Sequence, residues 1–104
     1  MTHQMKLRPL PFSQIQTGVK TLELRLYDEK RRLIRVGDRI TFTQTETGET
    51  LTVRVTSLHP FPCFGDLFAR LGTECCAGAV DMDLYYPPEQ QQRFGVLGIG
   101  ITLL

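Results

Sequence analysis

The stretch GVKTLELR, residues 18–25, decides the fold, because it combines a strand pattern with a cluster of polar side chains. Leucines occupy every second position from Leu22 to Leu26, which predicts a β-strand over about residues 20–27 with its leucine face in the core. The opposite face carries Thr21, Glu23, Arg25 and Tyr27, and Lys20 stands at the entrance of the strand. Such a polar face is either solvated or gathered to hold a polar ligand.

The residues before this strand predict a short strand and a helix. MKLR, residues 5–8, is a candidate first strand. Pro9 and Pro11 follow it, and proline is tolerated in the first turn of a helix but not in its interior. We therefore expect a helix over about residues 10–17 that ends at Gly18.

The residues after the strand predict a basic turn and a β-hairpin. DEKRRLIRVGD, residues 28–38, is the basic turn. RITFTQ at 39–44 and LTVRVTSL at 51–58 both alternate apolar with polar residues, and the intervening TETGET contains Gly48. We expect these two strands to pair in antiparallel fashion.

The C-terminal half changes its period from two to about 3.6 and back. Phe64, Leu67, Phe68 and Leu71 are spaced as on one face of a helix. Residues 73–86 are expected to form irregular helix, and PPEQQQRFG at 87–95 a helical turn opened by proline. VLGIGITLL, residues 96–104, alternates again as a final strand, and glycines on one of its faces allow another group to approach closely.

Together these elements predict one α+β domain over residues 1–104. About five strands in a chain of this length, paired in antiparallel or mixed fashion, avoid exposed edges by curling into a barrel. We expect the last strand to close the barrel against an early one.

Composition indicates a folded globular protein. Hydrophobic residues make up 41% and charged residues 22% of the 104. No apolar run approaches the roughly 20 residues that cross a bilayer, and the N-terminus lacks the apolar core of a secretory signal, so we expect a cytoplasmic protein with no membrane partner. Cys63, Cys75 and Cys76 form no zinc-like pairs, which predicts reduced thiols, no metal site and no cofactor.

The net charge of +1 hides an asymmetry along the chain. Residues 1–39 hold nine of the twelve Lys and Arg against four acids, a balance of +5, whereas residues 40–104 hold three against seven, a balance of −4. This excess is suited to an anionic partner, although it is also compatible with a solvated surface.

The order of these features resembles the ASCH domain, a family with a PUA-like β-barrel. The resemblance rests on GxKTxExR after the first helix, VGD after a basic turn, the β-hairpin, the short aromatic helix and FGVLGI in the last strand, and it covers nearly the whole chain. It implies a barrel of about five or six strands, with an N-terminal helix and short helices before the last strand. It also implies that the KTxExR side chains line a cleft between the barrel and the N-terminal helix.

Two functions follow from this resemblance. The family is generally predicted to bind RNA or nucleotides, so the first hypothesis is an RNA- or nucleotide-binding domain. Some small members resemble amidohydrolases for acetylated cytidine, with a lysine, a threonine nucleophile three residues later and a distant glutamate. In this chain Glu23 stands at the position of that threonine. The alternative hypothesis is therefore a hydrolase whose candidate catalytic residues are Lys20, Thr21, Glu23 and Glu74.

The candidate ligand-binding residues are mostly cationic. Arginine binds phosphate bidentately and stacks on bases, and Arg8 in addition stands at the start of the first helix, where free N–H groups favour an anion. Tyr85 and Tyr86 are suited to stacking on a base. A structural ion pair, a solvated turn and core packing are the alternatives for these groups. The predicted binding set is Arg8, Lys20, Thr21, Glu23, Arg25, Arg31, Arg32 and Tyr86.

Overall fold

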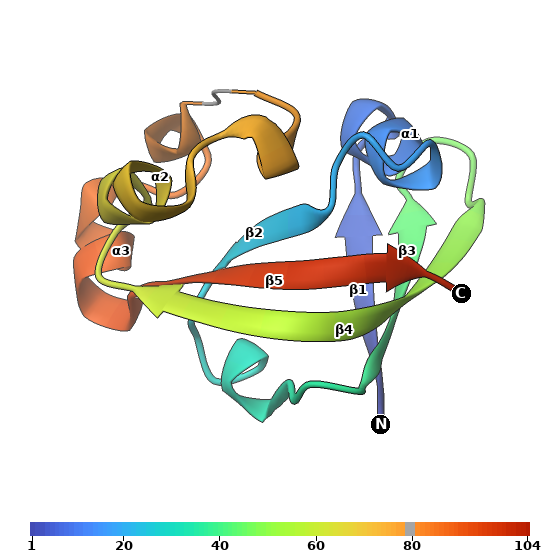
Figure 1. Ribbon diagram of the computed structural model, residues 1–104, viewed down its shortest axis with the longest axis horizontal. Helices are drawn as coiled ribbons and strands as arrows, with labels where there is room; N and C mark the ends of the chain where they lie inside the picture. Colours follow the sequence, from blue (N-terminus) through green and yellow to red (C-terminus); the bar gives the residue numbers. More distant parts are fainter. Residues whose placement is uncertain (79–80) are drawn as a thin grey trace.

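The computed structural model describes residues 1–78 and 81–104 (Figure 1). Its strands are β1 (Thr2–Leu7), β2 (Leu22–Leu26), β3 (Arg39–Gln44), β4 (Thr50–Phe61) and β5 (Val96–Leu103). Its α-helices are α1 (Pro9–Gln16), α2 (Phe64–Leu71) and α3 (Pro88–Phe94), and its single 3₁₀ turns are η1 (Arg31–Leu33), η2 (Glu74–Cys76) and η3 (Met82–Leu84).

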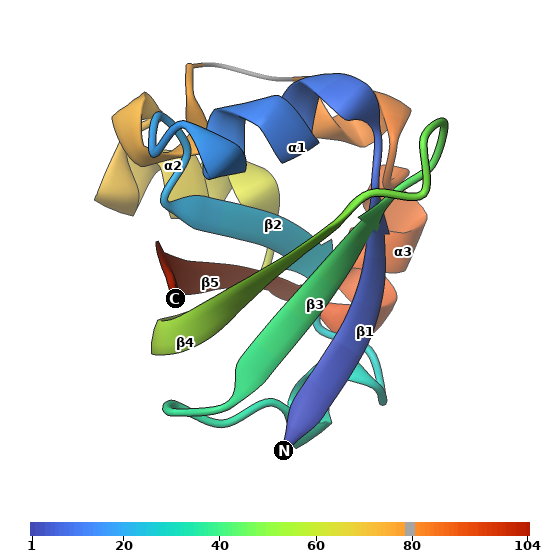
Figure 2. The same ribbon diagram turned by 90° about the vertical axis from the view of Figure 1, so that its right-hand side faces the viewer.

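The strands form one five-stranded sheet in the order β1-β3-β4-β5-β2. β1 pairs with β3 in parallel, and the other three pairings are antiparallel. The predicted hairpin is therefore confirmed as β3 and β4, and the last strand pairs with the early strand β2, as predicted. Figure 2 shows how the sheet curls beneath α1.

The α+β class is confirmed, and the barrel takes the form of a half-barrel. β1 and β2 are the two edges of the sheet, and neither pairs with the other. A side chain spans the two edges instead: Arg25 Nη2 donates a hydrogen bond of 2.8 Å to the backbone oxygen of Lys6. The arrangement matches a PUA-like barrel. The link between its two edge strands is the hydrogen bond of the Arg25 guanidinium and not a ladder of backbone hydrogen bonds.

Two strands extend further than their sequence patterns predicted. β1 begins at Thr2, and β4 continues through His59 and Pro60 to Phe61. The extra residues of β4 lie opposite the beginning of β5, with Pro60 opposite Leu97. The prolines in this stretch predict the end of a strand from the local sequence alone. They do not reveal that β5, from the other end of the chain, pairs with these residues.

The molecule has two hydrophobic cores, one on each face of β2 and β5. The inner core lies inside the curl, where Phe12 and Ile15 of α1 pack with Phe42 and Ile99. The outer core lies beneath α2, α3 and the 3₁₀ turns η2 and η3. It contains the three leucines of β2 (Leu22, Leu24 and Leu26), which are buried as predicted.

Register places the polar face of β2 toward the inner core. Glu23 lies opposite Ile99, and Arg25 lies opposite Leu97. Both β5 residues belong to the inner core, and directly opposed residues share a face of the sheet. Glu23 and Arg25 therefore point into the curl beneath α1, with the leucines facing the other way.

The expected helices near the C-terminus are present. α2 spans the predicted aromatic helix and α3 the predicted helical turn. Of the irregular helix predicted over 73–86, the described residues contain the turns η2 and η3, and residues 79–80 lie outside the described part of the chain. Within the described part of the chain, no helix is long and apolar enough to cross a membrane.

Candidate functional site in the cleft beneath the first helix

A buried carboxylate lies at the centre of the candidate site. Glu23 is only 3% exposed, and three donors surround it. Its Oε1 lies 3.0 Å from Lys20 Nζ and accepts a hydrogen bond of 3.0 Å from the backbone N–H of Leu24. Its Oε2 accepts one of 3.1 Å from Arg25 Nη2. Lys20, Glu23 and Arg25 thus converge in one ion-pair cluster.

Local structure explains how three residues of one short stretch meet. Glu23 and Arg25 are two apart on a strand and so point to the same side of it. Lys20 arrives from the turn after α1, in which Gly18 has a φ of 81° and Lys20 N–H donates to Gln14 O at 3.0 Å. A positive φ favours glycine. The turn at Gly18 places Lys20 above the entrance of the strand.

Electrostatics keep Glu23 ionised. Burial raises the pKa of this carboxyl, but the charges of Arg25 and Lys20, together with the hydrogen bonds from Lys20 and Leu24, outweigh burial. The pKa of Glu23 therefore lies below its ordinary value. The two cations exceed the single carboxylate by one positive charge.

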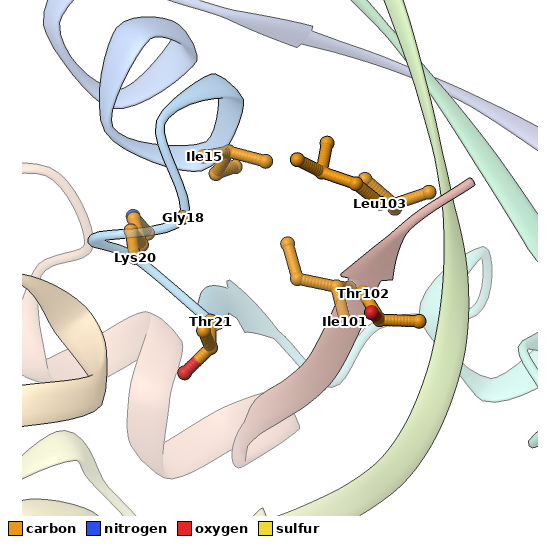
Figure 3. Close-up of a pocket in the computed structure, with 8 residues that line it drawn as sticks. Ile15, Gly18, Lys20, Thr21, Ile101, Thr102 and Leu103 are labelled. Carbon is orange, nitrogen blue, oxygen red and sulfur yellow. The ribbon is translucent and has the colours of Figure 1, made fainter.

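The cavity at this site is small. It has a volume of about 150 Å³ and lies between the end of α1 and the last residues of β5 (Figure 3). Among the predicted site residues only Lys20 and Thr21 line it, together with apolar side chains such as Ile15 and Leu103. Glu23 and Arg25 do not line this cavity, and both side chains are almost covered by the fold, so their part in ligand binding stays a prediction.

Thr21 connects the strand to two neighbours through its backbone. Its N–H donates to Cys75 O at 2.9 Å, and its oxygen accepts from Ile101 N–H at 3.0 Å. Its hydroxyl points away from Ile15 and Leu103 in Figure 3. Among the described residues, no hydrogen bond joins this hydroxyl to Lys20.

Comparison with known proteins identifies the family. The model of the ASCH domain matches residues 5–104, nearly the whole chain. This chain belongs to the ASCH domain family. The family is proposed to bind RNA.

Solved structures share the fold of this chain. The hypothetical protein PH0355 is 31% identical, with a TM-score of 0.87 and full coverage of both chains. Protein PF0455 from Pyrococcus furiosus is also 31% identical, with a TM-score of 0.75 and coverage of 100% of this chain and 98% of the other. The ASCH protein from Zymomonas mobilis shares the fold at 17% identity and a TM-score of 0.67, over 97% of this chain and 66% of its own. No curated protein matches this chain.

Arg8 lies on the surface of this ASCH domain, whereas Tyr86 is packed in the outer core. Arg8 directly precedes α1 and is exposed, with its guanidinium carbon 5.5 Å from the centre of the Tyr85 ring. Tyr86 packs in the outer core, with its ring 5.8 Å from that of Phe64. The tyrosine that is 53% exposed is the neighbouring Tyr85, which does not belong to the predicted binding set.

The start of α1 is a weaker anion site than its position suggested. Pro9 and Pro11 have no N–H, and Phe12 N–H already donates to Arg8 O. Only the N–H of Leu10 remains in the first turn. Any anion held here therefore depends on the Arg8 side chain.

Arg31 and Arg32 lie after β2, whereas Lys20 lies before it. Arg31 pairs with Asp28 at 3.1 Å. The Arg32 guanidinium lies 4.2 Å from the centre of the Tyr27 ring and donates to Phe94 O. The structure therefore does not bring these two arginines into the ion-pair cluster, and their role in ligand binding stays a prediction.

Glu74 and the neighbouring cysteines lie in η2, beside the beginning of β2. The Glu74 side chain is exposed, and among the described residues no salt bridge or hydrogen bond joins it to Lys20. Burial, followed by the neighbouring Cys75, raises the pKa of Cys76 to about 12, which keeps it a thiol. The sequence pattern did not predict the backbone hydrogen bond from Thr21 N–H to Cys75 O.

The described residues contain no cluster of three or more metal-ligating side chains. A larger hollow, of about 530 Å³, lies near α2 and α3 and is lined by residues such as Cys63, Asp83 and Gln91, with none of the predicted site residues. Gln91 is fully engaged there, since it accepts from Phe64 N–H and donates to Asp83 and to Tyr86 O.

Proposed function

We propose that this ASCH domain binds single-stranded RNA, or a nucleotide-like part of it, at a positively charged surface around the ion-pair cluster. We call this surface the basic mouth and define it as the ion-pair cluster of Lys20, Glu23 and Arg25 together with Lys6 and Arg8, the exposed cations at the end of β1. Four cations and one carboxylate give it a net charge of +3. The observation that carries the proposal is the convergence of Lys20 and Arg25 on one buried carboxylate.

The basic mouth combines fixed and exposed cations. Lys20 and Arg25 are held by Glu23, with only 11% and 14% of their side chains exposed. Lys6 and Arg8 are exposed, and Lys6 is joined to Arg25 through its backbone oxygen. The exposed cations can meet the phosphates directly, and the fixed cations add to the positive potential that attracts the nucleic-acid backbone from a distance.

The size of the cavity favours a strand lying across the surface over a nucleotide enclosed in a pocket. Pockets that enclose small ligands usually measure about 300–1,000 Å³. The cavity beside Lys20 and Thr21 measures about 150 Å³. Single-stranded nucleic acids bind along charged surfaces and need no such enclosure.

The hydrolase alternative has less support from the geometry. Glu23 is held as a carboxylate with a lowered pKa, which makes it a weak base, and the Thr21 hydroxyl has no hydrogen bond to Lys20 among the described residues. Turnover of acetylated cytidine by the wild type, measured against Lys20→Ala, tests this alternative. Activity in the wild type alone would replace the binding proposal.

Binding of a fluorescein-labelled octauridylate, followed by anisotropy over a series of salt concentrations, tests the proposal. We expect affinity to fall as salt rises, with a slope of about 0.7 per phosphate contact on logarithmic axes. Lys6→Glu and Arg8→Glu should each weaken binding and lower that slope. Both substitutions lie at exposed positions, so they leave the buried cluster intact.

The matched control is Arg54→Glu, which makes the same charge change at an exposed position of β4. It should leave octauridylate affinity within about twofold of the wild type. Equal losses in Lys6→Glu, Arg8→Glu and Arg54→Glu would show that only net charge matters and would overturn the basic mouth.

A further inference from the structure

Arg8 and Tyr85 form an open pair at the edge of the basic mouth. The guanidinium carbon of Arg8 lies 5.5 Å from the ring centre of Tyr85, within the range of a cation–π contact. Half of Tyr85 nevertheless stays in solvent, at 53% exposure. An aromatic ring with one face under an arginine and much of its surface free has room for a second flat partner.

The backbone holds this ring in place. Tyr85 N–H donates to Met82 O at 3.1 Å, and the next N–H, of Tyr86, donates to the same oxygen at 2.8 Å. The Tyr86 ring is packed against Phe64 in the outer core. One tyrosine therefore anchors the segment, and its neighbour projects into solvent.

A second arginine–tyrosine pair in this chain shows the contrast. Arg32 lies closer to its ring, 4.2 Å from the centre of Tyr27, and also donates to Phe94 O at 3.3 Å. Tyr27 packs against the inner core and is partly buried. The Tyr27 pair is closed and structural, whereas the Tyr85 pair is open.

We propose that Tyr85, with Arg8 behind it, is a stacking site for one unpaired base of single-stranded RNA. This inference rests on the proposed function, because Arg8 belongs to the basic mouth that would hold the flanking phosphates. Every base has a flat π-face, so the site selects unpaired nucleic acid and not a particular base. Because the prolines at the start of α1 have no N–H, the Arg8 side chain, and not the helix amides, would contact the neighbouring phosphate.

The test uses the absence of tryptophan from this chain. Tyr85→Trp introduces a single tryptophan, whose emission a stacked base quenches. We expect octaadenylate to quench it on binding, and an abasic ribose-phosphate oligomer of equal length to bind without quenching. Tyr27→Trp is the matched control, and its emission should not change with either oligomer.

Affinities measured by titration calorimetry complete the test. Tyr85→Ala should weaken octaadenylate binding roughly five- to 100-fold and leave the abasic oligomer within about twofold. Tyr85→Phe, which keeps the ring, should retain the affinity. Wild-type binding that Arg8→Glu weakens but Tyr85→Ala leaves unchanged would overturn the stacking site and leave the basic mouth standing. No binding of either oligomer by the wild type would overturn both.

Discussion

Glu23 holds two cations, and each of them reaches a different part of the molecule. Lys20 forms part of the cavity wall between α1 and β5. Arg25 reaches β1 through the oxygen of Lys6. A single buried carboxylate therefore fixes the cations on which the basic mouth depends.

Removing that carboxylate should destabilise the fold strongly. Glu23→Ala leaves two nearly buried cations without their shared partner, and breaking a buried pair in this way costs about 3–5 kcal/mol. Urea unfolding measures this loss. Glu29→Ala is the control, because that side chain is exposed, and it should change stability by less than about 0.5 kcal/mol. Equal effects in the two variants would contradict a central role for Glu23.

Asp38 predicts how stability responds to acid. It accepts from His3 Nε2 at 2.8 Å and from Arg35 N–H at 3.0 Å, and these hydrogen bonds lower the pKa of Asp38 to about 2, from 3.8. A lowered pKa stabilises the folded state above pH 3.8, and that stabilisation is lost as the pH falls toward 2. In urea titrations, the stability difference between wild type and Asp38→Asn should shrink as the pH falls from about 3.8 toward 2. A difference that does not change with pH would contradict this.

At the residue scale, alternation was enough to predict which side chains of the strand share a face. It placed Glu23 and Arg25 together and Lys20 beside them. Alternation did not show that the carboxylate is buried. Both faces of β2 are covered, and the residues that cover its polar face come from α1 and β5, which the pattern of a single strand does not include. Two adjacent tyrosines carried no signal of which one would be anchored, and the exposed one proved to be Tyr85.

Among the elements, β5 is the strand that both cores depend on. Gly98 lies where the outer core is tightest: a methyl group there would sit 3.2 Å from Leu67 of α2 and 3.3 Å from Leu22 of β2. The glycine thus lets α2 pack directly on the sheet. The sequence pattern predicted a close approach on this face of the strand and left open whether a backbone or a ligand makes it.

Gly98→Ala should loosen the packing of α2 on β5. Forcing an extra carbon into a filled core costs about 1–3 kcal/mol, because the neighbouring leucines must leave their preferred positions. Thermal unfolding compares this variant with Thr102→Ala, an exposed position on the same face of the strand. Equal melting temperatures for the two variants would show that the outer core tolerates the methyl group.

The helices and strands could be predicted because each carries its own local period. The 3.6-residue period of α2 and the alternation of β3 and β4 are set within the elements themselves. The ends of β1 and β4 are set by pairing with residues far along the chain, so local patterns placed them too short.

For the whole molecule, the half-barrel brings the two edges of the sheet together at the basic mouth. β1 supplies Lys6, the β1–α1 junction supplies Arg8, and β2 supplies Arg25. The excess of basic residues in the first 39 positions predicted an anion-binding surface. It did not distinguish these cations from Arg31 and Arg32, which the fold places beyond the other end of β2.

One NMR titration tests the central claim most directly. Octauridylate added to ¹⁵N-labelled protein should shift the amide signals of residues 6–8, 20–25 and 84–86, which the fold gathers around the basic mouth. Shifts confined to residues 35–54, on β3, β4 and the loop before them, would contradict the claim that this ASCH domain binds RNA at the basic mouth.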